Sequence, residues 1–406
     1  MLETSFSGVA VVAAVAFLVP VALGLDPRVR LPTAVLEILV GIAIGPHALG
    51  WVRMDPAIDV LSMVGLAFLL LLGGLEVDFE RLRGKLLRTT GLGFMLSLGL
   101  ALGVAATLSA IGLIQAPLLV AIILSATALG VIIPVLQDGG ESAAEFGQLV
   151  IAGASIADLA TILLLTLFFS AEATSVGSKG ALVATLFLLA GVLVLGVLRV
   201  ERSMRLSAIL VRLQDTSAQI RVRGAFFLLA GFVALAELLG LEVILGAFVA
   251  GAILRLVDRD EAMTHPLFRA KLEAIGFGVF APIFFVATGL RFDLPAVVGS
   301  PSTIALVPLF LGALLVVRGL PALLYQPTLG TRGALAAGLL QATSLGFIVV
   351  ATQIGMELGQ LADAVGAALV GAGLLSVLIF PLAAATILGR QQTAVEGASP
   401  AAAKSH

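Results

Sequence analysis

Long apolar segments follow one another along almost the whole chain. Each runs for roughly 18 to 25 residues, the length that an α-helix needs to cross a hydrocarbon core about 30 Å thick. With 60% hydrophobic and only 12% charged residues among 406, a water-soluble fold lacks the interior to bury them. The sequence therefore predicts an all-α, polytopic membrane protein. We expect about thirteen transmembrane helices, at 7–24, 31–49, 58–74, 89–113, 117–136, 146–170, 180–199, 221–240, 242–256, 273–290, 302–325, 331–356 and 361–388.

The basic residues are distributed unevenly between the segments that separate these spans. If the N-terminus lies outside, nearly all of the 23 lysines and arginines fall on the inner side. By the positive-inside rule we expect a multi-pass protein of the cell membrane, with its C-terminal tail, residues 391–406, in the cytoplasm. The start MLETSF carries an acid and no base, so we expect a retained helix and no cleaved signal peptide. The basic segment 199–223 is expected to contact anionic lipid head groups.

Three short sequence stretches recur in the same order, about two hundred residues apart. An odd number of spans separates the members of each pair, so the two halves should have opposite orientations in the membrane. The predicted transport domain, residues 1–390, thus consists of inverted repeats at about 1–170 and 221–388, joined by a linker helix at about 180–199. The matched stretches are LEILVG (36–41) with LEVILG (241–246), GLEVDF (74–79) with GLRFDL (289–294), and SATALG (125–130) with QATSLG (341–346).

The third pair places hydroxyls and glycine about halfway along a span. Inverted repeats are typical of secondary transporters, in which substrate binds near the midplane on interrupted helices. If both helices unwind there and cross, backbone and hydroxyl oxygens converge as ligands for a small cation. The alternative is that small residues only allow close helix packing. The predicted neutral ligands are Thr127 and Thr343, with possible support from Ser125, Gln341 and Ser344.

One carboxylate lies at the same depth. Asp158 is about twelve residues, hence ~18 Å, from the inner end of its span, and inserting its charge costs on the order of 3 kcal/mol or more. We expect no base at similar depth, since the nearest, Arg318, falls in the inner third of the span 302–325. Asp158 is therefore expected to bind H⁺ and a cation alternately. Ser155, one turn earlier, is a further ligand or bonds its own helix backbone.

Other polar groups give weaker signals. Glu37, Glu237 and Glu242 are expected in ion pairs or helix caps, although participation in ion binding stays open. The chain has no cysteine and its three histidines lack metal-ligand spacing, so we expect no transition-metal site and no cofactor. No nucleophile–base pair, paired aspartate or zinc-binding motif is present in the sequence, which argues against an enzyme.

Several longer stretches resemble a known family. LPTAVLEILVGIAIGPHALGWV (31–52), LGAFVAGAILR (245–255) and FAPIFFVATGLRFDL (280–294) are similar to the second family of monovalent cation:proton antiporters, within the sodium/proton exchanger superfamily. The resemblance covers nearly the whole chain. It implies exchange of Na⁺ or K⁺ for H⁺ by elevator-type alternating access. It also implies a homodimer, with a dimerisation domain and a six-helix core built around two crossed, discontinuous helices.

Two departures from that family refine the expectation. Electrogenic relatives place two acids side by side where this chain has Ala157 and Asp158, and they carry a lysine that the span 273–290 lacks. Both differences favour electroneutral exchange. The tail 391–406 is too short for the nucleotide-binding domain of glutathione-gated potassium-efflux relatives, so we expect no such attached domain. We also expect no nucleic-acid partner. A sodium-coupled transporter of an organic solute is the alternative function, and the choice between Na⁺ and K⁺ stays open.

Overall fold

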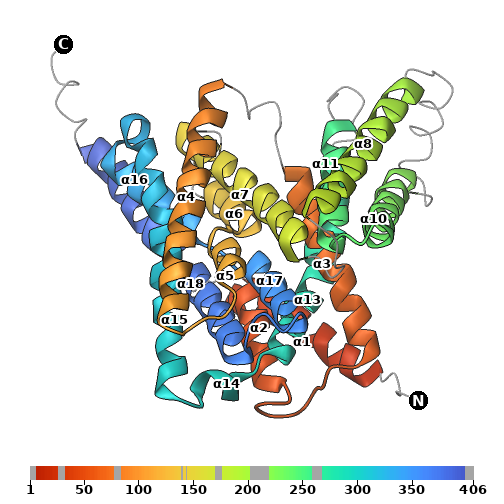
Figure 1. Cartoon of the computed structure of the whole chain (residues 1–406), viewed down its shortest axis with the longest axis horizontal. Helices are drawn as coiled ribbons and strands as arrows, with labels where there is room; N and C mark the ends of the chain where they lie inside the picture. The colour runs from red at the N-terminus through yellow and green to blue at the C-terminus, as the bar shows by residue number, and fades with distance from the viewer. Residues whose placement is uncertain are drawn as a thin grey trace. The chain divides into compact units, whose positions relative to one another are not determined.

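Helices make up most of the residues that the structure describes (Figure 1). The structure is a computed structural model, and the part it describes contains helices and no strand. The prediction of an all-α protein is confirmed. Contacts divide the chain into a first unit, 1–78 with 162–292, and a second unit, 79–161 with 293–406. The described residues are 6–25, 33–76, 84–138, 140–142, 144–169, 176–201, 219–257 and 268–397.

The first unit is held together by helices that cross with their backbones in contact. It contains α1 (Phe6–Leu25), α2 (Thr33–Ile44), α3 (Pro56–Glu76), α8 (Val176–Glu201), α10 (Ile220–Leu238), α11 (Val243–Val257), α12 (Phe268–Ile275), the π-helix η1 (Gly276–Phe280) and α13 (Ala281–Arg291). The most extensive contacts join α3 to α11 and α2 to α13.

Reciprocal glycines form both of these crossings. A Cβ on Gly41 of α2 would overlap a carbonyl oxygen of α13, and a Cβ on Gly289 of α13 would overlap a carbonyl oxygen of α2. Gly74 of α3 and Gly251 of α11 repeat this arrangement. Two repeats related as predicted would produce such a pair of contacts. The contacts match Gly41 with Gly251, whereas the sequence match pairs Gly41 with Gly246. The inverted repeat itself stays a prediction.

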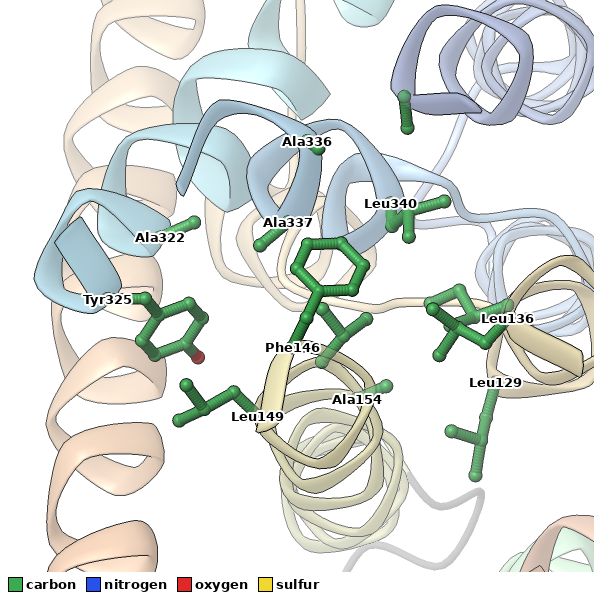
Figure 2. Close-up of a cluster of buried hydrophobic side chains, with 13 residues drawn as sticks. Leu129, Leu136, Phe146, Leu149, Ala154, Ala322, Tyr325, Ala336, Ala337 and Leu340 are labelled. Atoms are coloured by element: carbon green, nitrogen blue, oxygen red, sulfur yellow. The ribbon is translucent and has the colours of Figure 1, made fainter. Parts of the chain in front are cut away.

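The second unit contains the interrupted helices. Its elements are α4 (Gly84–Ala110), α5 (Pro117–Leu124), α6 (Leu129–Asp138), α7 (Glu145–Phe169) as far as Thr161, α14 (Leu294–Val298), α15 (Pro301–Leu314), the π-helix η2 (Leu315–Gly319), the 3₁₀-helix η3 (Leu320–Tyr325), α16 (Gln326–Ala342), α17 (Gly346–Glu357) and α18 (Asp363–Gly397). Figure 2 shows the buried apolar cluster that packs α7 against α6, η3 and α16, with Phe146, Leu136 and Leu340 among its members.

Each of the thirteen predicted spans falls on helix. Eight helical stretches among the described residues are long and apolar enough to cross a membrane, and the last but one of them, Pro301–Glu357, includes two predicted spans. Apolar helices shorter than this cover Thr33–Ile44, Pro117–Ile133 and Val243–Val257. The total of thirteen crossings therefore stays a prediction. The helix α18 extends to Gly397, so the predicted tail begins as helix, and most of the basic segment 199–223 lies outside the described residues.

Candidate ion-binding site

Both predicted helix interruptions are present. Residues 125–128 separate α5 from α6, and residues 343–345 separate α16 from α17. Ser125 caps α5 and its hydroxyl donates to the Ala121 carbonyl at 2.8 Å. Thr343 leaves helical geometry with φ −72° and ψ 116°. Two discontinuous helices, expected from SATALG and QATSLG, are thus confirmed.

The two interruptions are bound to each other. The Ala128 amide donates to the Thr343 carbonyl at 2.8 Å, and the Thr127 hydroxyl donates to the Gln341 carbonyl at 2.9 Å. The Ala128 amide and the Thr343 carbonyl, which lie where the helices unwind, thus satisfy each other across the crossing, as the interior of a membrane protein requires. Four half-helix ends meet at this crossing, and their partial charges give it both positive and negative poles.

The interruption at 343–345 is also fastened to α18. The Ser376 hydroxyl accepts from the Ser344 amide at 3.1 Å and bonds the Ser344 and Gly373 carbonyls at 3.0 and 2.7 Å. The side-chain hydroxyl of Ser344 is buried and has no hydrogen-bond partner among the described residues. The Thr343 hydroxyl donates to the Leu339 carbonyl of its own helix at 3.2 Å.

Arg318 lies in this site, and the expectation that no base reaches the depth of Asp158 is wrong. The Arg318 side chain is 1% exposed. Its Nε donates to Thr127 Oγ1 at 2.8 Å, its Nη1 to Ser97 Oγ at 3.3 Å and its Nη2 to Gln341 Oε1 at 3.4 Å. Its guanidinium also interacts electrostatically with Asp158. The Asp158 carboxylate therefore has a counter-charge within the second unit.

Asp158 and Ser155 share one face of α7, since residues three apart on a helix are neighbours. The Asp158 side chain is half-buried and its Oδ1 atom is enclosed. The Ser155 hydroxyl is buried and, within the described part of the chain, makes no hydrogen bond. It therefore does not bond its own helix backbone, which was the alternative role expected for it. By contrast, the Thr161 hydroxyl bonds the Ala157 and Asp158 carbonyls at 2.8 and 3.2 Å.

The structure separates the predicted residues into two groups. Thr127 and Gln341 already use their polar atoms on Arg318 and on each other. The hydroxyls of Ser155 and Ser344 are buried without hydrogen-bond partners in the described chain, which is costly unless something else satisfies them. Together with the Asp158 carboxylate, they offer the oxygen ligands that a hard monovalent cation prefers.

Three residues of the site were not expected from the sequence. Ser97 of α4 is fully buried against Arg318. Tyr325, the chain's single tyrosine, accepts a hydrogen bond from Gln341 Nε2 at 2.9 Å. Gly153 of α7 faces both Gln341 and Tyr325, and a Cβ there would lie 2.9 Å from the tyrosine oxygen. A lone tyrosine and a serine inside apolar spans were signals that the sequence offered.

The three glutamates considered from the sequence all belong to the first unit. Glu37 is buried within α2, Glu237 is exposed in the last turn of α10, and Glu242 is half-buried just before α11. The candidate site described above belongs to the second unit.

Comparison with known proteins identifies the family. The family model described as "Sodium/hydrogen exchanger, transmembrane" matches residues 13–389. The chain belongs to the sodium/hydrogen exchanger family. It is accordingly a multi-pass membrane protein of a transporter family, as predicted from the apolar spans and the resemblance.

Individual relatives agree with this assignment. YjbQ of Bacillus subtilis, named as a Na(+)/H(+) antiporter, is 30% identical over 411 residues, covering 97% of this chain and 64% of the relative. The chain thus spans just under two thirds of that relative. A Methanocaldococcus jannaschii protein named as Na(+)/H(+) antiporter 3 is 27% identical over 380 residues, covering 92% and 94%.

A solved structure shows the same fold. The sodium proton antiporter MjNhaP1 from Methanocaldococcus jannaschii, determined at pH 8, superposes with a TM-score of 0.63. The two chains are 16% identical, and the match covers 94% of this chain and 98% of the other. This chain therefore shares the fold of that antiporter.

Proposed function

We propose that the protein exchanges a monovalent cation, Na⁺ or K⁺, for H⁺ across the cell membrane. Asp158 binds the two ions alternately, and Ser155, Ser344 and backbone oxygens of the helix interruptions complete the cation's ligand shell. One observation carries this proposal. The unit that contains the crossed, broken helices also holds the Asp158 carboxylate and two buried hydroxyls that find no hydrogen-bond partner among the described residues. The relatives' names, which refer to Na⁺/H⁺ antiport, support the choice of ions.

Thr127 and Thr343 have a different part in this proposal from the one expected. Thr127 Oγ1 both donates to the Gln341 carbonyl and accepts from Arg318. A cation placed on that hydroxyl would lie beside a guanidinium charge. The Thr343 carbonyl already accepts from Ala128. We therefore propose that both threonines hold the crossing together, while a carbonyl's second lone pair remains available to the ion.

The charge balance favours electroneutral exchange. Arg318 stays protonated because a guanidinium does not lose its proton in proteins. Asp158 is then the one group of the described site that takes up and releases a proton. Its carboxylate carries either one H⁺ or one monovalent cation, so the net charge of the loaded site is the same in both directions. Transport by such a site does not respond to membrane potential.

The same reasoning supports an elevator-type cycle. The residues that bind the ions all belong to the second unit, so that unit can carry its cargo as one body. We further propose that the protein is a homodimer with its N-terminus outside and its C-terminus in the cytoplasm. It would be surrounded by lipids, some of them anionic on the basic inner face.

The test uses purified protein in liposomes that contain a pH-sensitive dye. Outward gradients of Na⁺, K⁺ or Li⁺ are imposed with and without a clamp on the membrane potential. Because cation leaving the liposomes is exchanged for entering H⁺, wild type should acidify the lumen independently of potential, and Asp158→Asn should abolish the signal. Asp363→Asn, which alters an exposed carboxylate at the start of α18, is the matched control and should exchange normally.

Two results would refute parts of the proposal. Exchange retained by Asp158→Asn would remove the carboxylate from its assigned role. Absence of proton movement with any cation, from protein that elutes as a single species, would reject antiport. Uptake of a labelled organic acid driven by Na⁺ would then favour the solute-transport alternative.

A further inference from the structure

The guanidinium of Arg318 is held by three neutral oxygens. We name Ser97 Oγ, Thr127 Oγ1 and Gln341 Oε1 the Arg318 cradle; each accepts one hydrogen bond from a different nitrogen of the side chain. All three residues are at most 2% exposed. Because the cradle carries no charge, it orients the guanidinium without neutralising it. The positive charge therefore acts on Asp158, the acid with which it interacts electrostatically.

Ser97 has a second contact that explains its place in the cradle. Its hydroxyl donates to the Val317 carbonyl at 2.7 Å. In a regular α-helix this carbonyl would accept from the residue four positions later, but that residue is Pro321, which has no N–H. The helix changes to π geometry at Leu315–Gly319 and to 3₁₀ geometry from Leu320. Ser97 thus secures both the irregular backbone and the guanidinium that projects from it.

Tyr325 contacts the cradle through the side-chain amide of Gln341. The Gln341 Nε2 donates to the Tyr325 hydroxyl at 2.9 Å, which leaves Oε1 of the same amide directed at Arg318. Tyr325 is 2% exposed, and Figure 2 shows its hydroxyl directed toward α7, the helix that carries Leu149 and Ala154. Gly153 of α7 makes room for both side chains.

We propose that Ser97 and Tyr325 are positioning residues that set the affinity of the site for the transported cation. The cradle holds the guanidinium through hydrogen bonds, whereas Asp158 attracts it through charge. Loss of a cradle contact shifts this balance toward Asp158. A guanidinium closer to the carboxylate competes better with the cation, so cation affinity falls while the translocation step is spared. This inference rests on the proposed antiport.

The test compares Ser97→Ala and Tyr325→Phe with wild type in the same dye-loaded liposomes, using Na⁺ at a series of concentrations. A hydrogen bond to a charged group corresponds to about a tenfold change, so Ser97→Ala should raise the KM for Na⁺ about tenfold. Tyr325→Phe removes a neutral hydrogen bond and should raise it about fivefold. In both variants kcat should stay within about twofold of wild type. Ser97→Thr, which keeps the hydroxyl, should restore most of the affinity.

Thr90→Val is the matched control. Thr90 is buried on the same helix, α4, but its hydroxyl donates to the Leu86 carbonyl of that helix at 2.7 Å and touches no cradle residue in the described structure. The KM of Thr90→Val for Na⁺ should equal that of wild type. A rise in KM equal to that of Ser97→Ala would mean that any lost buried hydroxyl has this effect, and would overturn the proposal.

Other outcomes also decide the question. An unchanged KM in Ser97→Ala and Tyr325→Phe, or a fall in kcat with KM unchanged, would overturn the positioning role. If Ser97→Ala fails to give a monodisperse protein, the conservative Tyr325→Phe decides alone. Wild-type protein is measured in parallel. If the wild type shows no exchange, the proposed antiport is rejected; if it exchanges and the variants keep its KM, only the positioning role is rejected.

Discussion

Replacing Gly251 by alanine tests whether the first unit depends on backbone contact between α3 and α11. A Cβ at Gly251 would lie 2.8 Å from the carbonyl carbon of Leu71 and 2.9 Å from the amide nitrogen of Leu75, and closer still to the Leu71 oxygen. These are backbone atoms of another helix, so no side-chain rotation can relieve the overlap. The two helices must move apart.

The size of the effect follows from these distances. Ordinary contact begins at 3.4 Å, so the two helices must separate by about 0.5 Å at the amide nitrogen and by more at the carbonyl oxygen. Overpacking of a dense interior lowers the free energy of unfolding by about 1 to 3 kcal/mol. Separation also loosens the reciprocal contact of Gly74, so we expect the upper value, about 3 kcal/mol. For a unit of roughly two hundred residues, this lowers the melting temperature by about 6 °C or more.

Thermal unfolding of the detergent-solubilised protein, followed by loss of the monodisperse elution peak, provides the measurement. Gly231→Ala of α10 is the control, because a Cβ there meets no atom within 4 Å. It should leave the melting temperature unchanged or raise it slightly, since alanine favours helix over glycine by about 1 kcal/mol. Equal melting temperatures for Gly251→Ala and Gly231→Ala would refute the close crossing.

Two substitutions in the second unit give further tests. Gly153→Ala would place a methyl group 3.2 Å from Cδ of Gln341 and nearer to Tyr325. It should destabilise the protein by about 1 to 3 kcal/mol, measured by thermal unfolding. It should also raise the KM for Na⁺, measured by exchange in liposomes. Ser376→Ala removes the buried hydroxyl that bonds the Ser344 backbone. It should lower the free energy of unfolding by about 1 to 3 kcal/mol and reduce the rate of exchange. Full activity with wild-type stability would contradict this role.

The features of the fold that follow from local composition were accessible from the sequence. Continuous apolar segments of membrane-spanning length predict helices because no other regular segment satisfies its own backbone in lipid. The interruptions were also predictable, since SATALG and QATSLG place hydroxyls and glycine where an uninterrupted span would be apolar. Their mutual hydrogen bonds were not, because the sequence does not specify which atoms meet when two segments far apart in the chain cross.

Close helix crossings illustrate the same limit. Gly41 and Gly289 belong to stretches already selected by their recurrence, but a glycine in an apolar span is common and its packing partner is not encoded nearby. Contact with a carbonyl of another helix became visible only in the fold. There, the reciprocal contacts match Gly41 with Gly251, whereas the local sequence match pairs Gly41 with Gly246. Equivalence judged from contacts and equivalence judged from short sequence matches therefore differ at this position.

The depth of Arg318 was misjudged for a physical reason that the sequence does contain. Tyr325 is the expected inner end of the span 302–325. Counting from it toward the middle of the span, at 1.5 Å per residue, places Arg318 in the inner third. The six residues Leu320–Tyr325 are 3₁₀-helical, however, and at about 2.0 Å per residue they place Arg318 ~3 Å deeper than a regular helix would. Pro321 is the visible cause, because it removes the N–H that an α-helix would direct at Val317. A proline just after a buried arginine thus indicates that residue count underestimates the depth of the arginine. The interaction between Arg318 and Asp158 then makes the carboxylate one of two opposite charges in the same site.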